Sequence, residues 1–196
     1  MRRRSMQTAH KRWRFACAAL ALAAGSLACS MDLGGPKPPG DPIPTSSTAA
    51  QEIQDAWASA AGTSASTGEL RLIINESQLT SLVAARLAEK EDPILRDPQV
   101  YLRDGQLQVY GTVRQGMFQG EVLLSITPVL DPDGTLAFEV TSADLGPLPA
   151  SEGIRQSLSA LVTEAFAGPI GSLATGLRIT SIAIADGELA LVGEIR

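Results

Sequence analysis

Apolar and polar side chains alternate along residues 100–113, which read VYLRDGQLQVYGTV. Alternation with a period of two is typical of a β-strand that buries one face. Asp104-Gly105 interrupts the pattern and favours a two-residue type I′ turn, because both central residues of that turn need positive φ. We therefore predict a β-hairpin whose dry face carries Leu107 and Val109. The opposite, solvated face is predicted to carry Tyr101, Arg103, Gln106, Gln108, Tyr110, Thr112 and Arg114.

The same pattern returns at residues 182–195, IAIADGELALVGEI, after a shift of 82 residues without a gap. An aspartate, two glycines and a leucine are identical at the same spacing, which favours a duplicated unit over two unrelated hairpins that share turn chemistry. Gly111 and Gly193 hold the same place in the two copies. A missing side chain there allows the sheet to coil sharply or a helix to approach closely.

A further hairpin is predicted between the two copies, with strands over residues 121–130 and 135–143. Its turn, DPDG at residues 131–134, suits a type I turn opened by Pro132 and closed by a left-handed Gly134.

Two amphipathic helices are predicted, one ahead of each copy of the repeated hairpin. A short strand over residues 69–74 leads into the first helix, where Asn75 is the N-cap and Gln78 completes a capping box. The second helix begins at Ser151 and ends before Gly168. Apolar residues recur at helical spacing on one face of each helix. These stripes comprise Leu79, Leu82, Val83 and Leu87 in the first helix, and Ile154, Leu158, Leu161, Val162, Ala165 and Phe166 in the second.

Because hairpins join the strands, the fold class is predicted to be α+β and not α/β. We expect a curled antiparallel sheet of about seven strands wrapped around the two amphipathic helices, with a repeated helix–hairpin unit. Residues 68–196 are long enough to form a single α+β domain.

Residues 1–28 have the composition of a secretory signal peptide, with six basic residues followed by an apolar run that is too short to span a bilayer comfortably. Small and apolar residues precede Cys29, as in a bacterial lipoprotein signal, although Ser26 stands where leucine is most common. We expect Cys29 to carry acyl chains such as palmitate, with plain cleavage as the alternative. A lipid anchor would hold the protein at the extracytoplasmic face of the cell membrane.

Residues 29–48 are rich in proline and glycine and contain little apolar surface, so they are predicted to be an extended tether. At about 3 Å per residue, such a tether would reach ~60 Å from its anchor. Residues 49–61 are predicted to form a short helix, and residues 62–67 a flexible joint. We interpret the short helix as a frayed end, with a flap over an apolar groove as the alternative.

The mature chain is strongly acidic. The full sequence has 16 basic and 21 acidic residues, and loss of the six basic residues in the signal peptide leaves ten, for a net charge of −11. An acidic domain repels phosphate backbones, so nucleic acid is excluded as a partner. The same charge disfavours docking onto anionic headgroups, so any contact with lipid must depend on apolar burial.

Cysteine and histidine are confined to Cys17, Cys29 and His10, all before residue 30. The folded domain therefore cannot contain a disulfide, a cysteine or histidine metal site, or a Ser-His-Asp triad. We expect no metal, no cofactor and no enzymatic activity.

Four segments resemble the YpmS-like and LmeA-like envelope lipoproteins and, more distantly, the tubular lipid-binding (TULIP) superfamily. They are INESQLTSLVAARL, YLRDGQLQVYGTV, PVLDPDGTLAFEV and LRITSIAIADGELALVGEI, and they cover most of residues 68–196. The resemblance implies a helix cradled by a curved sheet and the binding of phospholipid or another lipid.

We therefore expect a membrane-anchored lipoprotein that binds a lipid or other apolar ligand in a groove between sheet and helix. The candidate groove residues are Leu82, Val83, Leu107, Val109, Leu158, Leu161, Val162 and Phe166. The alternative is a non-enzymatic module that binds an envelope protein through the outer face of the second hairpin. That face is unusually apolar and carries Ala183, Ala185, Ala190 and Val192.

Overall fold

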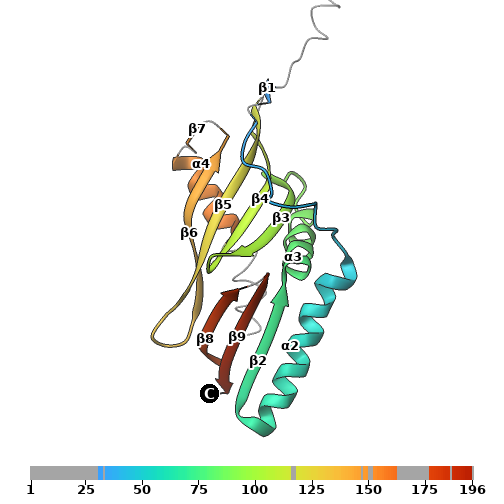
Figure 1. The fold of residues 1–196 in the computed structure, drawn as a ribbon, viewed down its shortest axis with the longest axis vertical. Coiled ribbons are helices and arrows are strands. Elements are labelled where there is room, and N and C mark those ends of the chain that lie inside the picture. Colours follow the sequence, from blue (N-terminus) through green and yellow to red (C-terminus); the bar gives the residue numbers. More distant parts are fainter. Residues whose placement is uncertain are drawn as a thin grey trace, which may run out of the picture. The chain divides into compact units, whose positions relative to one another are not determined.

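Figure 1 shows the ribbon of a computed structural model of the chain, which describes residues 31–32, 34–115, 118–146, 148–149, 152–162, 177–185 and 187–195. The chain divides into two units, residues 1–31 and residues 32–196. Of the first unit the structure describes only Met31, and the fold belongs to the second. The predicted signal peptide and Cys29 lie outside the described residues.

The larger sheet is antiparallel and has the strand order β3-β4-β5-β6-β7. The strands along this path are β3 (Leu95–Arg103), β4 (Gln106–Gln115), β5 (Phe118–Leu130), β6 (Leu136–Leu145) and β7 (Leu148–Pro149). The smaller sheet is also antiparallel and has the order β2-β9-β8. Its strands are β2 (Glu69–Asn75), β8 (Leu177–Ala185) and β9 (Glu188–Ile195), and a two-residue strand, β1 (Met31–Asp32), precedes both sheets in the chain. The predicted α+β class with antiparallel strands is confirmed, with the strands divided between two sheets.

The two copies of the repeated hairpin pair in the same register. Leu102 pairs with Leu107 in the first copy, and Ile184 pairs with Leu189 in the second, 82 residues later. In the first copy the turn residue Asp104 has φ of 55°, as a type I′ turn requires. The predicted repeat is therefore present in the strand pairing as well as in the sequence.

Each copy also has a bulge in its first strand, and the repeated glycine lies opposite it. A Cβ on Gly111 would lie 2.7 Å from Leu95 Cδ1 and 2.8 Å from the carbonyl oxygen of Arg96. A Cβ on Gly193 would lie 3.0 Å from the carbonyl oxygen of Arg178. The close neighbour of each glycine is thus the bulged partner strand and not a helix.

The helix before β2 is longer than predicted. Helix α2 (Ser47–Thr67) has 21 residues and continues through residues 62–67, where we expected a flexible joint. Ile53 and Trp57 on this helix are buried in the core, so the interpretation as a frayed end is wrong. Figure 1 shows α2 running alongside β2.

The serine- and threonine-rich end of α2 stays helical because its hydroxyl groups find partners within the helix. Ser64 Oγ donates to the Ala61 carbonyl at 2.7 Å, and Ser66 Oγ donates to the Thr63 carbonyl at 2.8 Å. Gly68 then ends the helix with φ of 76°, and its N–H donates to the Ser64 carbonyl.

Helix α3 (Glu76–Ala88) begins with the predicted capping box. Asn75 Oδ1 accepts from the Gln78 N–H at 2.9 Å, and Gln78 Oε1 accepts from the Asn75 N–H at 3.0 Å. The second predicted helix is α4 (Glu152–Val162), and its described part lies against β6.

Side chains of α3 cover the free edge of β3. Thr80 Oγ1 accepts from the Val100 N–H at 2.9 Å, and Glu76 Oε1 accepts from the Leu102 N–H at 2.8 Å. Glu76 also forms an ion pair with Arg103. These contacts satisfy β3 backbone donors that have no neighbouring strand on that side.

We expect Thr80→Val to lower the free energy of unfolding by about 2 kcal/mol, because it leaves the buried Val100 N–H without an acceptor. Thr80→Ser keeps the hydroxyl and should recover most of the loss. Urea unfolding measures both variants, and a valine variant as stable as the parent chain would show that the bond contributes nothing.

The turn of the β5–β6 hairpin joins the larger sheet to β8. Gly134 has φ of 83°, and its N–H donates to the Asp131 carbonyl at 2.8 Å, as predicted for this turn. The Gly134 carbonyl then accepts from the Ile179 N–H at 3.1 Å. A side chain on Gly134 would overlap Arg178, so glycine is needed both for the turn and for the docking.

Candidate functional site

The inner faces of both sheets, together with α2, α3 and α4, enclose one apolar cluster. Five predicted groove residues belong to it and are almost fully buried: Leu82 and Val83 from α3, Leu107 and Val109 from β4, and Leu158 from α4. Leu161 and Val162 lie in α4, but the structure does not describe their side chains, and Phe166 lies outside the described residues. The structure therefore brings at least these five residues together.

Part of the inner face is only partly covered. On β6 the partly buried residues are Val140, Ala143 and Leu145, and on β8 they are Ile182 and Ile184. All five pack against the buried cluster. Since α4 lies against β6, the three β6 residues form an apolar surface between the larger sheet and this helix, whereas the two β8 residues belong to the smaller sheet.

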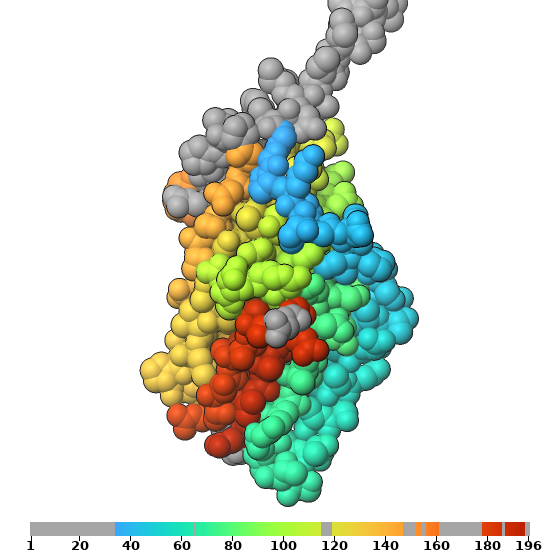
Figure 2. All heavy atoms as spheres, in the orientation of Figure 1, coloured from blue at the N-terminus to red at the C-terminus, as the bar shows by residue number. Residues whose placement is uncertain are grey.

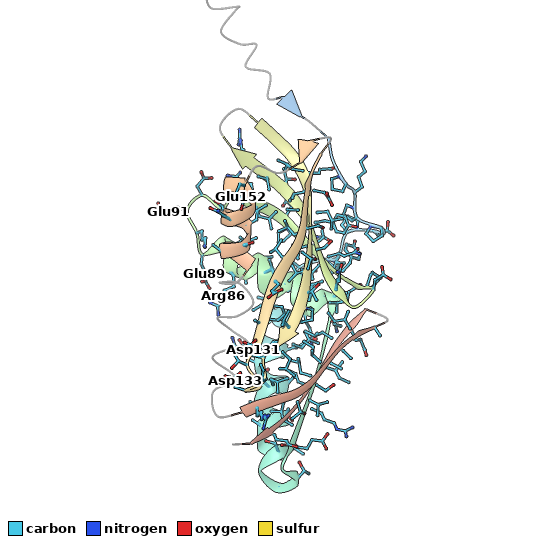
Figure 3. All side chains as sticks on the ribbon, turned by 90° about the vertical axis from the view of Figure 1, so that its left-hand side faces the viewer. Arg86, Glu89, Glu91, Asp131, Asp133 and Glu152 are labelled. Atoms are coloured by element: carbon cyan, nitrogen blue, oxygen red, sulfur yellow. The ribbon has the colours of Figure 1, made fainter. Side chains whose placement is uncertain are left out.

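Acidic side chains surround this side of the molecule. In Figure 3 the labelled residues Glu89 and Glu91 follow α3, Glu152 begins α4, and Asp131 and Asp133 lie in the β5–β6 turn. All five are exposed. Arg86, labelled beside them, forms an ion pair with Glu89 at 3.2 Å, so these six side chains carry five negative charges and one positive charge. The local charge thus agrees in sign with the net charge of −5 of the full sequence.

A second apolar surface lies on the outside of the smaller sheet. A groove of about 590 Å³ runs between α2 and β2, with Ala56 and Ala60 on one wall and Ile73 on the other. Ile73 is 59% exposed and occupies the outer face of β2. The register places it beside Ala190 and Ala183, and Ala183 stays exposed. The predicted outer patch of the second hairpin is therefore exposed at Ala183 and Ala185 and half-buried at Ala190 and Val192, and Ile73 extends it.

The predicted solvated face of the first hairpin is covered by part of the predicted tether. Residues 34–46, here called the strap, run over the outer face of β3 and β4. The Ile43 N–H donates to Gln99 Oε1 at 2.6 Å, and Gln99 Nε2 donates to the Ile43 carbonyl at 3.3 Å. Tyr101 OH donates to the Asp41 carbonyl at 3.2 Å. In Figure 2 the strap, in blue, lies on the green and yellow surface of these strands.

Both ends of the strap are also held. The Glu121 N–H donates to the Gly34 carbonyl at 3.2 Å, and the Ser46 N–H donates to Ser81 Oγ at 3.1 Å. The prediction of a free tether is therefore wrong for residues 34–46. Low apolar content shows that a segment cannot form a core, but an extended backbone still offers N–H and carbonyl groups to polar side chains.

The strap buries two tyrosines on that face. The rings of Tyr101 and Tyr110 meet edge to face with centroids 5.6 Å apart, and both residues are less than 10% exposed. Burial raises the pKa of both phenols above the usual value of 10.0, and the negative charge of Glu76 adds to the effect at Tyr101. Both phenols are therefore neutral and able to donate hydrogen bonds at physiological pH.

A small cavity of about 120 Å³ lies beneath the strap, lined among others by Pro36, Tyr110 and Glu121. Glu121 Oε2 is buried there without a hydrogen-bond partner among the described residues. The cavity is large enough to hold the water that would satisfy it.

Other kinds of site find little support in the part of the chain that the structure describes. No group of three histidine, cysteine, aspartate or glutamate side chains is placed there to hold a metal ion. No helix within those ranges combines the length and apolar character needed to cross a bilayer.

Comparison with known families identifies the chain. A family model described as LmeA-like phospholipid-binding matches residues 47–194, from the first residue of α2 almost to the end of β9. Comparisons with curated proteins and with solved structures gave no match. The family match covers about three quarters of the sequence and includes every helix and long strand described above. The chain therefore belongs to the LmeA-like phospholipid-binding family.

Proposed function

We propose that this chain is a lipid-anchored, extracytoplasmic binding protein without enzymatic activity, which holds phospholipid between the larger sheet and α4. The observation that carries the proposal is the partly covered apolar surface of β6 beside α4, in a chain of a phospholipid-binding family. Acyl chains need an apolar surface of this kind, and they need no charged partner.

The anchor is proposed at Cys29, where the apolar run of the signal peptide ends. An acyl anchor would keep the domain near the membrane from which it takes its ligand. The acidic residues around the α4 side favour zwitterionic over anionic headgroups, because like charges repel.

Ala143 offers a direct test of the binding surface. Its register partner is the fully buried Leu124, so its side chain faces inward. Ala143→Trp should fill the space beside α4 and abolish the lipid adduct that native mass spectrometry detects on the mature chain incubated with phosphatidylcholine vesicles. Ala137→Trp is the matched control, because Ala137 lies on the same strand but on the outer face, opposite Val129.

The smaller substitution Ala143→Met should reduce the adduct in part, and it guards against a tryptophan variant that fails to fold. Equal lipid binding by the Ala143 and Ala137 variants would contradict the proposed groove. A parent chain that stays free of lipid would favour the second candidate function, a module that binds an envelope protein. The apolar row of Ile73, Ala190 and Ala183, exposed at Ile73 and Ala183, supports that candidate.

A further inference from the structure

The strap fixes where the chain leaves the domain toward its N-terminus. Gly34 is bonded to Glu121, and Glu121 pairs with Thr112 near the end of the β4–β5 hairpin that contains Gln115 and Phe118. Four residues, 30–33, separate Gly34 from Cys29. At up to ~3.5 Å per residue, the chain between Gly34 and Cys29 can span at most about 17 Å.

We propose that the docked strap orients the domain on the membrane, with the Gln115–Phe118 end of the β4–β5 hairpin facing the bilayer. The inference rests on the proposed anchor at Cys29. A free tether would allow ~60 Å of separation and every orientation. The docked strap reduces the separation to about 17 Å and selects one end of the domain.

A few specific hydrogen bonds from β3 side chains hold the middle of the strap. Gln99 uses both ends of its amide on the backbone of Ile43, and Tyr101 donates to Asp41 two residues away. The strap lies on the outer face of the larger sheet, opposite the face that lines the apolar cluster. Docking the strap therefore leaves the proposed lipid surface open while it sets the orientation of that surface.

The orientation also determines which end of the apolar surface beside β6 and α4 lies nearest the membrane. Leu145 on the inner face of β6 pairs with Val122, one residue from the strap contact at Glu121. The end of the apolar surface that carries Leu145 and Ala143 is therefore the end nearest the bilayer. A phospholipid would enter from this end without crossing the length of the domain.

The first experiment tests strap docking without the membrane. In the full chain carrying Cys29→Ser, which cannot be lipidated, hydrogen exchange by NMR should show a protected Ile43 amide. Gln99→Ala should speed exchange of that amide about tenfold, because both Ile43 bonds are lost. Gln106→Ala is the matched control, since the Gln106 amide on the same sheet face donates to Thr127 of β5 and not to the strap.

The second experiment measures orientation on the membrane. The mature lipidated chain has no free thiol after Cys29, so a fluorophore can be attached to Arg114→Cys or to Thr135→Cys. Arg114 pairs with Gln119 near the proposed membrane end, whereas Thr135 follows the β5–β6 turn, about 40 Å away along β5 at ~3.3 Å per residue. On phosphatidylcholine vesicles with a headgroup-labelled acceptor, energy transfer should be several-fold stronger from position 114.

The outcomes separate the two proposals. A protected Ile43 amide with stronger transfer from position 114, which declines in the Gln99→Ala variant, supports the inference. A fast-exchanging Ile43 amide, or equal transfer from both positions, overturns it, even when the chain floats with the vesicles. A chain that does not float with the vesicles overturns the anchor, and with it the orientation, whatever the exchange rate of Ile43.

Discussion

Replacing Gly111 with alanine is expected to lower the free energy of unfolding by about 3 kcal/mol. The added methyl group would lie 2.8 Å from the carbonyl oxygen of Arg96 and 2.7 Å from Leu95 Cδ1. Leu95 is fully buried, and the Arg96 oxygen belongs to the backbone of a bulged strand, so neither can move without disturbing the edge of the larger sheet. A domain that is stable by about 5–15 kcal/mol would lose a large part of that margin.

Alanine variants of two other glycines serve as comparisons for this prediction. Gly193→Ala should cost less, because its nearest neighbour, the Arg178 carbonyl oxygen, is 3.0 Å away. Gly62→Ala should stabilise the protein by up to about 1 kcal/mol, because Gly62 lies inside α2 with open space around it and alanine is the better helix former. Denaturant unfolding of the three variants gives the order. A Gly111 variant as stable as the parent would show that the bulge relaxes easily.

Trp57→Ala is expected to destabilise the protein by about 3–5 kcal/mol, the usual cost of removing a large buried aromatic side chain. Trp57 is 6% exposed and belongs to the main apolar cluster together with Ile53. The family match begins at the first residue of α2, which agrees with a helix that is part of the domain.

Asp55→Ala is the control, because Asp55 lies on the exposed face of the same helix and its loss should change stability by less than about 0.5 kcal/mol. Urea unfolding followed by far-UV circular dichroism measures both variants. If the two variants were equally stable, α2 would be an appendage and not part of the core.

Local rules explain which elements could be predicted. The Asp104-Gly105 turn, the Asn75–Gln78 capping box and the left-handed Gly134 each depend on a few adjacent residues, and all three are present. The inner face of the strands followed from alternation, since Leu107 and Val109 are buried as expected.

Long-range contacts explain what could not be predicted. Serine, threonine and glycine at residues 62–67 are typical of a loop, yet burial of Ser64 and hydroxyl bonds within the helix keep them helical. Tyr101 alternates as a solvent-facing residue and becomes buried only because the strap, 60 residues earlier, crosses it. Neither the helical end of α2 nor the burial of Tyr101 is indicated by the residue pattern of its own segment.

The buried apolar cluster was predicted in part. Sequence periodicity found Leu158 and Val83, because core positions recur at helical spacing. It missed Ala143, because a bulge in β6 changes which positions of the strand face inward. Alternation along β6 alone therefore does not show that Ala143 pairs with the buried Leu124. It also missed the groove beside Ile73, although the adjacent pair Ile73-Ile74 breaks strict alternation and could have indicated an apolar outer face.

The side chains that cover the edge of β3 have a consequence for crowded membranes. An uncovered strand edge is a template for pairing with another chain and so for aggregation. Thr80 and Glu76 accept from two backbone donors of β3, and the Gly134 carbonyl accepts from the Ile179 N–H of β8. Under the proposed anchoring, many copies on one surface would meet at high local concentration, and these few polar contacts would keep them from joining edge to edge.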